Sequence, residues 1–148
     1  MSIEKSPPKH IIFAGGFVFK DGKLLVAQRA MDEGHLPGYW GVPGGKVELE
    51  TEVWNIIEKT VQNEVLEETG VTIQAEMSMF CNNSFLRTDG QPVIAINFIC
   101  NYSSGSAEPL DGTSAVRWVK EDELDQLQIE SNSLKQMKLA FKLVTIPN

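Results

Sequence analysis

Three glutamates, Glu64, Glu67 and Glu68, lie close together near the middle of the chain. If this stretch is helical, residues three and four positions apart share one side, so the three carboxylates gather within about one turn. Neighbouring carboxylates repel one another, and their oxygens are the ligands that Mg²⁺ and Mn²⁺ prefer. The spacing therefore indicates a divalent-metal site, against the alternative of a solvated acidic face at the end of a helix.

The same predicted helix has an apolar stripe at spacings of three and four, which consists of Trp54, Ile57, Val61 and Val65. Glu68 continues this stripe, so we expect it to point towards the covered side, where a lone carboxylate is costly. Carboxylates near the end of a helix also meet the negative end of its dipole. Both costs favour the metal site over the solvated face.

The turn that precedes this helix contains Gly44 and Gly45 after Pro43. Glycine adopts backbone conformations that are closed to other residues. Such a turn can direct a backbone carbonyl, that of Gly44 in our interpretation, towards a metal ion. Carbonyl and carboxylate oxygens are both ligands of hard divalent cations.

Residues 64–71, EVLEETGV, together with Gly45 resemble the Nudix box, GX5EX7REUXEEXGU, in which U is an aliphatic residue. The preceding stretch WGVPGGKVE, residues 40–48, is similar to the usual lead-in of that family. A later stretch, VRWVKEDEL at residues 116–124, is similar to a segment common near the end of its domains. The resemblance covers the chain from about residue 10 to residue 144.

Two departures from the box are visible. Asn63 stands where the family has an Arg that holds the catalytic glutamates in place. The box is also stretched, because ten residues separate Glu52 from Asn63 where the family pattern has seven. Glu50 or Glu52 could stand for the first box glutamate, or neither could, and the extra residues could lengthen the start of the helix.

The resemblance implies a hydrolase that cleaves a nucleoside diphosphate linked to another group X, with Mg²⁺ or Mn²⁺ as the cofactor. It implies that Glu64, Glu67 and Glu68 are the catalytic residues and bind the metal, with Gly44 and Glu48 as further metal contacts. Glu64 is the first candidate for a metal ligand or for the base that activates the attacking water.

Other residues are candidates for substrate contact. Arg29 ends a predicted strand, where the family often has an Arg that meets a phosphate, although a solvent-facing Arg is equally compatible with the sequence. Trp40 is a candidate for stacking on a base or for the core, and Gly45 is a candidate for substrate contact. In the later loop, Asp111 and Glu108 are candidates for an additional acid, and Asp111 is slightly favoured.

The resemblance leaves the group X open. ADP-ribose enzymes of the family often have a proline some fifteen residues beyond the box, whereas here the first is Pro92, and no coenzyme A signature is visible. A nucleoside triphosphate, normal or damaged, is favoured by elimination, and a nucleotide sugar or ADP-ribose is the alternative. Asn63 supports a further alternative, a Nudix-like module that binds a nucleotide without cleaving it.

Strand patterns surround the glutamate helix. Residues 10–20 and 23–29 are expected to form a hairpin around Asp21 and Gly22. A second hairpin is expected from residues 72–86 and 92–102, and its last strand is apolar on both faces, which is typical of a sheet covered on both sides.

The end of the chain is expected to form a strand at 114–120, a short helix at 121–127 and a helix at 131–144 capped by Ser131. With the resemblance, this order predicts the α/β Nudix fold, an α/β/α sandwich with a mixed sheet.

The composition of the chain limits the kinds of molecule that it is expected to bind. The chain has 148 residues and a net charge of −7, which disfavours the basic surface that nucleic acids need. No apolar run reaches membrane-spanning length, and the first residues lack the apolar region of a signal peptide.

We expect a cytoplasmic protein with a flexible lead-in at residues 1–9 and one domain at 10–148. Its expected partner is a small nucleotide rather than nucleic acid or membrane; homodimerisation stays open. His35 is expected to be exposed and has no assigned role.

Overall fold

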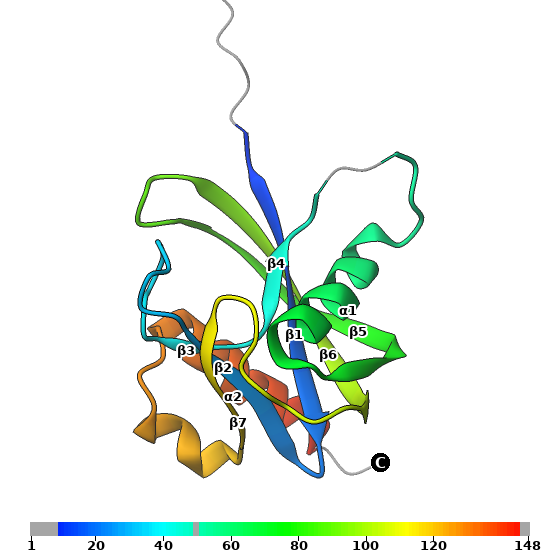
Figure 1. The fold of residues 1–148 in the computed structure, drawn as a ribbon, viewed down its shortest axis with the longest axis vertical. Helices are drawn as coiled ribbons and strands as arrows, with labels where there is room; N and C mark the ends of the chain where they lie inside the picture. Colours follow the sequence, from blue (N-terminus) through cyan, green and yellow to red (C-terminus); the bar gives the residue numbers. More distant parts are fainter. Residues whose placement is uncertain (1–8, 49–50, 146–148) are drawn as a thin grey trace, which may run out of the picture.

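The fold was obtained as a computed structural model, which describes residues 9–48 and 51–145. Figure 1 shows a sheet with a helix on each side and a short 3₁₀ helix, η1. The elements in chain order are β1 (Ile11–Lys20), β2 (Lys23–Arg29), β3 (Trp40–Gly41), β4 (Gly44–Lys46), α1 (Ile56–Thr69), β5 (Thr72–Leu86), β6 (Pro92–Ser104), β7 (Thr113–Val119), η1 (Glu121–Gln126) and α2 (Ser131–Val144).

The seven strands form one mixed sheet. Its main path runs β3-β2-β1-β6-β5, while β4 pairs with β1 and β7 pairs with β2. β1 and β6 are parallel, and the other pairs are antiparallel. The predicted β1–β2 turn is confirmed, because Asp21 and Gly22 both have positive φ, 51° and 76°, as a two-residue hairpin turn of the primed kind requires.

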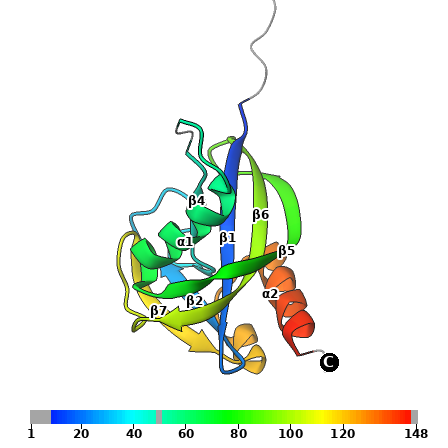
Figure 2. The same ribbon diagram turned by 90° about the vertical axis from the view of Figure 1, so that its right-hand side faces the viewer.

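The two faces of the sheet bury separate cores. Alternate residues of β1 point to opposite faces, so Ala14 and Val18 pack under α1 while Phe17 and Phe19 pack under α2. Figure 2 shows the two helices on opposite sides of the sheet. This arrangement confirms the predicted α/β/α sandwich with a mixed sheet.

The glycine pair in β1 lets two elements approach the strand closely. A Cβ atom on Gly16 would lie 2.9 Å from Val61 Cγ1 and 3.0 Å from Val65 Cγ2, so α1 packs directly on the backbone of β1. A Cβ atom on Gly15 would lie 2.5 Å from the Asn97 amide oxygen. The parallel pairing with β6 continues through both glycines, so the strand has no bulge there.

The start of α1 differs from the prediction. Trp54 was expected in the apolar stripe but lies before the first helical residue, and its side chain is 86% exposed. Val61 and Val65 are buried as expected. The extra residues of the stretched box therefore belong to the connection between β4 and α1 and do not lengthen the helix, because α1 begins only at Ile56. Glu50 lies outside the described residues, as does all of the predicted lead-in except Lys9.

The cap of α2 was also predicted wrongly. Glu130, and not Ser131, is the capping residue, and its carboxylate accepts hydrogen bonds from the backbone N–H groups of Asn132 and Ser133, each at 3.0 Å. Burial acts to raise the pKa of Glu130, but these hydrogen bonds outweigh it and hold that pKa below its usual range. Met137 and Phe141 of α2 are buried beneath the sheet, whereas Val144 is 39% exposed at the end of the helix.

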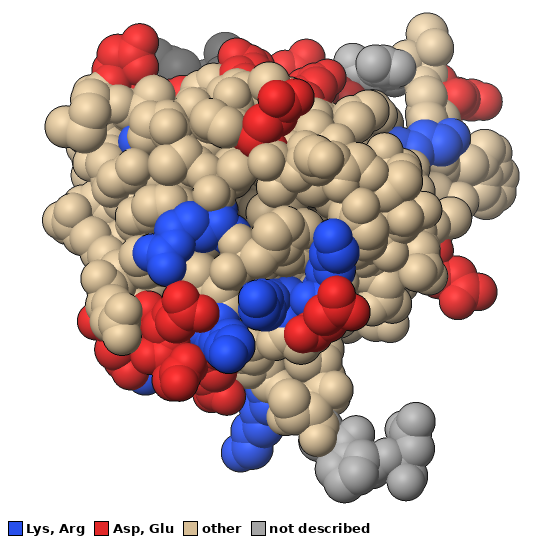
Figure 3. All heavy atoms as spheres, turned by 60° about the horizontal axis from the view of Figure 1, so that its bottom comes forward, with Lys and Arg blue, Asp and Glu red and all other residues tan. Residues whose placement is uncertain are grey.

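Acidic and basic side chains are mixed on the surface of this acidic chain. On the face drawn in Figure 3, Lys and Arg lie among Asp and Glu, so the residues drawn in colour there form no continuous basic surface. In the part of the chain that the structure describes, no helix is both long and apolar enough to cross a membrane.

Candidate active site

The short strand β4 brings the Pro-Gly-Gly turn against the glutamate helix. β4 pairs with β1, with Gly45 opposite Ala14 and Gly44 opposite Gly15. A Cβ atom on Gly44 would lie 2.5 Å from the Ala14 carbonyl oxygen, and one on Gly45 would lie 2.6 Å from Glu64 Oε1. Both glycines are therefore needed for close approach, and Gly45 in particular leaves the room that the Glu64 carboxylate occupies.

The three glutamates near the end of α1 do not share one environment. Glu64 and Glu68 are half-buried, whereas Glu67 is exposed. Glu68 Oε1 accepts a hydrogen bond from the backbone N–H of Gly44 at 3.2 Å. Glu68 therefore points towards the covered side of the helix, which confirms that expectation. Gly44 thus contacts the glutamates through its N–H, and the predicted role of its carbonyl as a metal contact stays a prediction.

The site is rich in uncompensated negative charge. Burial, together with the Glu64 charge, raises the pKa of Glu68 to about 8, against the opposing effects of the Gly44 hydrogen bond and the Arg29 charge. Burial and the charge of Glu67 raise the pKa of Glu64, while a hydrogen bond from Glu68 lowers it. Burial and the neighbouring carboxylates thus disfavour the charged forms of both Glu64 and Glu68.

Of the other acidic candidates, two lie near Glu64. The charges of Asp111 and Glu48 both raise the pKa of Glu64, after burial and Glu67. Glu108 lies elsewhere, because its Cγ and Oε1 are 3.5 and 3.6 Å from the position of a Cβ on Gly70, just after α1. Glu52 is exposed in the connection that leads to α1.

The loop between β6 and β7 closes the end of α1. The backbone N–H of Glu108 donates to the Thr69 carbonyl at 2.9 Å, and that of Leu110 donates to the Glu68 carbonyl at 3.0 Å. These bonds satisfy carbonyls that a helix end leaves without partners. They also hold the loop that carries Asp111 next to the glutamates.

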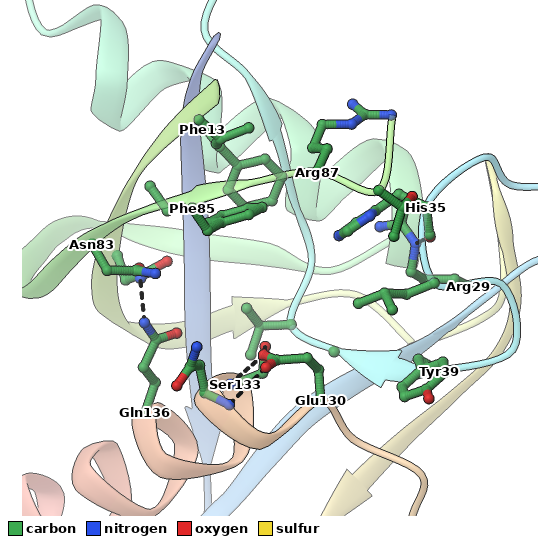
Figure 4. A pocket seen from close by; sticks show the side chains of 18 of the residues that line it. Phe13, Arg29, His35, Tyr39, Asn83, Phe85, Arg87, Glu130, Ser133 and Gln136 are labelled. Atoms are coloured by element: carbon green, nitrogen blue, oxygen red, sulfur yellow. Dashed lines mark hydrogen bonds between the residues drawn. The ribbon is translucent and has the colours of Figure 1, made fainter. Parts of the chain in front are cut away.

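A cavity of about 450 Å³ lies on the other side of β4 from α1. Figure 4 shows side chains from β1, β5, α2 and the loop between β2 and β3 pointing into it. Lys46 lines the cavity while its neighbour Gly45 faces Glu64, as alternation along a strand requires. The polar and aromatic lining consists of Phe13, Arg29, His35, Tyr39, Trp40, Lys46, Asn83, Phe85, Arg87, Thr88, Asn97, Glu130, Asn132, Ser133 and Gln136.

Arg29 and Trp40, two of the three predicted substrate contacts, line this cavity. Arg29 Nε donates to the His35 carbonyl, and its Nη2 lies 3.6 Å from Glu33 Oε2. Trp40 is half-buried, and it also packs against the core beneath α2. Gly45 is the third predicted contact. It lies against the Glu64 carboxylate and does not line the cavity.

Sequence reasoning missed several cavity residues. His35 was expected to be exposed, but it is half-buried, and its ring stacks on Phe85 with centroids 6.1 Å apart and planes 18° apart. Arg87 lies in the turn between the two strands of the second predicted hairpin, and it also lines the cavity. Asn83 of β5 accepts a hydrogen bond at 2.9 Å from Gln136 of α2, 53 residues away. No local pattern marks these residues, because the tertiary fold alone brings them together.

The chain was compared with known proteins. The family model described as the NUDIX domain matches residues 9–140. A MutT-like protein of Streptomyces ambofaciens is 32% identical over 132 residues, which are 88% of this chain and 77% of that protein. The family model and the similar protein therefore both match most of this chain.

Solved structures are similar in fold. A MutT NUDIX hydrolase from Burkholderia pseudomallei has a TM-score of 0.73 at 24% identity, over 93% of this chain and 99% of that one. The NUDIX domain of Shewanella oneidensis NrtR, solved as a complex with ADP ribose, has a TM-score of 0.72 at 20% identity, over 95% and 91% of the two chains. At such low sequence identities, the similarity to these structures shows a shared fold.

Proposed function

This chain belongs to the Nudix hydrolase family, and we therefore propose that it is a metal-dependent pyrophosphohydrolase that cleaves a nucleoside diphosphate linked to a group X. The observation that supports this most is the placement of the Glu64 and Glu68 carboxylates against Gly45 and Gly44, next to a nucleotide-sized cavity. The preferred substrate is a nucleoside triphosphate or a related nucleotide.

The donor set suits a hard divalent cation, Mg²⁺ or Mn²⁺. Glu64, Glu67 and Glu68 would hold it, with Glu48 as a further partner, and carboxylate oxygens are the ligands that such ions select. In the described residues no three acidic, His or Cys side chains already surround a single point, so the proposal depends on the chemistry of the donors. The cation would neutralise charge on phosphate oxygens and acidify the attacking water.

The protein side chains would do the rest of the chemistry. The Glu64 carboxylate, which lies against the Gly45 backbone, would accept the proton of the water that attacks phosphorus. The Gly44 N–H would keep Glu68 oriented through its hydrogen bond. Arg29 lines the cavity and also acts on the pKa of Glu68, so it would offset phosphate charge between the two.

Asp111 is the better candidate for an additional acid in the later loop. Its charge acts on Glu64, whereas Glu108 lies against Gly70 beyond the end of α1. For Gly44 we now favour its N–H, through Glu68, over its carbonyl as the group that serves the site.

Two alternatives have specific support. A nucleotide sugar or ADP-ribose would also fit the family, and one structural neighbour was solved with ADP ribose. A module that binds a nucleotide without cleaving it is supported by Asn63, which lacks the charge of the box Arg. In either case the partner is a small nucleotide, and we expect the protein to meet it in the cytoplasm, as a monomer or a homodimer.

A hydrolysis screen tests the proposal. Nucleoside triphosphates, nucleotide sugars, ADP-ribose and dinucleoside polyphosphates are incubated with the wild type and with Glu64→Gln, in the presence of Mg²⁺ or Mn²⁺. We expect turnover of at least one nucleotide, and a loss of at least about 100-fold in kcat in the variant. Glu121→Gln, an exposed glutamate of η1, is the matched control and should retain full activity. Turnover that is equal in wild type and Glu64→Gln would remove Glu64 from the mechanism.

A further inference from the structure

The cavity concentrates positive charge in an acidic chain. Arg29, Lys46 and Arg87 all line it, although the whole chain has a net charge of −7. Among the lining residues that the structure describes, Glu130 is the one carboxylate, and its oxygens already accept hydrogen bonds from the start of α2. Three cationic side chains therefore face the cavity against one described carboxylate in its lining.

The arginines are paired only loosely. Arg87 Nε lies 3.5 Å from Asp89 Oδ1, and Arg29 Nη2 lies 3.6 Å from Glu33 Oε2. Asp89 has 58% of its side chain exposed, so water screens much of this attraction. Neither acid lines the cavity.

Two buried polar atoms in the cavity wall have no hydrogen-bond partner among the described residues. They are His35 Nδ1 and Arg87 Nε, and both are shielded from solvent; the 3.5 Å approach of Arg87 Nε to Asp89 is an ion pair without hydrogen-bond geometry. Buried polar atoms in folded proteins nearly always have a hydrogen-bond partner, and one without a partner is destabilising. Two such atoms in one cavity wall point to a group that the substrate would supply.

The local arrangement fixes the orientation of these groups. The His35 ring stacks on Phe85, and the His35 carbonyl accepts the hydrogen bond from Arg29 Nε. Figure 4 shows Arg87, His35 and Arg29 on neighbouring parts of the wall, from the β5–β6 hairpin and the loop after β2. We call these three residues together with Phe85 the Arg87 end of the cavity.

Electrostatics at the Arg87 end complement this geometry. Burial first, and then the charges of Arg29 and Arg87, lower the pKa of His35, while Asp89 and Glu130 act weakly in the opposite direction. The ring is therefore neutral at neutral pH. An anion bound beside it would offset both arginines and favour a proton on the ring.

We propose that His35 and Arg87 form an oxyanion subsite, which binds the terminal phosphate of a nucleoside triphosphate. The guanidinium of Arg87 and a ring N–H of His35 would donate to the phosphate oxygens. Arg29 connects this subsite to the glutamates, because it contacts His35 and its charge reaches Glu68. Nucleotide sugars and ADP-ribose have no terminal phosphate to place there, so the subsite selects among the substrates left open above. This assignment of the phosphate rests on the proposed function.

The first test needs no turnover. The chain has two histidines, His10 and His35, so NMR signals of their rings can be assigned with a His10→Gln variant. The pKa of His35 is measured without divalent metal, in the presence and absence of inorganic triphosphate. We expect the anion to raise the pKa of His35 by about one unit or more, as an opposite charge at close range does.

Two arginine variants make this test specific. Arg87→Gln should abolish the triphosphate-induced rise, and Arg117→Gln should leave it intact, because Arg117 pairs with Glu123 on the surface and does not line the cavity. Arg87→Lys keeps the charge without the planar donors and should retain a weaker rise, which guards against misfolding of Arg87→Gln. A pKa of His35 that is unaffected by triphosphate, or a rise that is equal in Arg87→Gln, would overturn the subsite.

The second test compares substrates. In the wild type and in Arg87→Gln, kcat and KM are measured for a nucleoside triphosphate and for ADP-ribose. We expect Arg87→Gln to raise KM about tenfold for the triphosphate only, with little change in kcat. An equal effect on both substrates would overturn the assignment to a terminal phosphate. An inactive wild type whose His35 still responds to triphosphate would overturn the proposed hydrolysis and support the anion subsite.

Discussion

The two ends of the candidate site have opposite charge imbalances. At the carboxylate end, formed by Glu64, Glu68 and the backbone of Gly44 and Gly45, negative charge is in excess and the pKa of Glu68 is raised to about 8. At the Arg87 end, three cationic side chains line the cavity against one described carboxylate, and burial with the arginine charges lowers the pKa of His35. Under the proposed function, a metal cation would balance the carboxylate end and a phosphate would balance the Arg87 end, so a nucleotide bound with its metal would supply both.

The comparison explains how an acidic protein can bind a polyanion. The net charge of −7 repels a nucleotide at long range, but the folded chain separates the two signs across β4. Acidic groups gather where α1 meets the glycine turn, and basic groups gather where two loops meet above the cavity. A negative net charge therefore disfavours a basic surface for nucleic acid but leaves a local phosphate site open.

The largest effect should come from breaking the carboxylate end alone. Gly45→Ala places a Cβ atom 2.6 Å from Glu64 Oε1, so the carboxylate must move. We expect kcat to fall about 100-fold, because small displacements of a catalytic group have effects of that size. The response of His35 to triphosphate should stay unchanged. Gly34→Ala is the control, since its Cβ would meet nothing within 4 Å; an equal loss in both variants would contradict this explanation.

The next effect concerns metal binding. Glu67→Gln and Glu68→Gln should each weaken Mn²⁺ binding by about tenfold or more, because each removes a charge from the donor set. Isothermal titration calorimetry on the folded chain measures this. Arg87→Gln serves as the control at the opposite end and should bind Mn²⁺ as the wild type does. Unchanged titrations in both glutamate variants would exclude these residues as metal ligands.

A gain is expected from restoring the box cation. Asn63 is exposed on α1, one residue before Glu64. Asn63→Arg would add a charge that orients the carboxylates and offsets their repulsion, so kcat should rise by up to about tenfold. Asn63→Gln, which adds no charge, should leave kcat unchanged. If Asn63→Arg is neutral or harmful, another feature of this chain, such as Lys59 one turn earlier, already fills that role.

The smallest effect is expected on the free energy of unfolding, from removing the Glu130 cap of α2. Glu130→Ala removes the cap and should cost about 1 kcal/mol in the free energy of unfolding at pH 7, whereas Ser131→Ala should cost much less. The folded-state pKa of Glu130 lies below the ordinary value of 4.5, so its stabilisation is present above that value. The difference between wild type and Glu130→Ala should therefore vanish as the pH falls through the lowered pKa. Urea denaturation at pH 7 and pH 3 measures it, and a larger cost for Ser131→Ala would restore the sequence-based cap.

Local patterns were predicted well because their geometry depends on neighbours in the chain. The i, i+3 and i+4 spacing puts Glu64 and Glu68 on the same side of α1, and the Asp21–Gly22 pair forms its turn without help from the rest of the protein. The same reasoning failed for Trp54, since nothing in the apolar spacing shows that α1 starts only at Ile56.

The amino-acid sequence was enough to predict the family, the order of the helices and of the strands other than β4, and the face on which Glu68 lies, because these follow from short-range periodicity and from a contiguous motif. Only the tertiary structure decided what those groups meet. The Gly44 bond to Glu68 joins residues 24 positions apart, and the cavity joins the loop after β2 to the β5–β6 hairpin and to α2. Long-range packing sets the burial and the neighbouring charges, and these decide the pKa values of Glu68 and His35 and hence the kind of ligand that each end can bind.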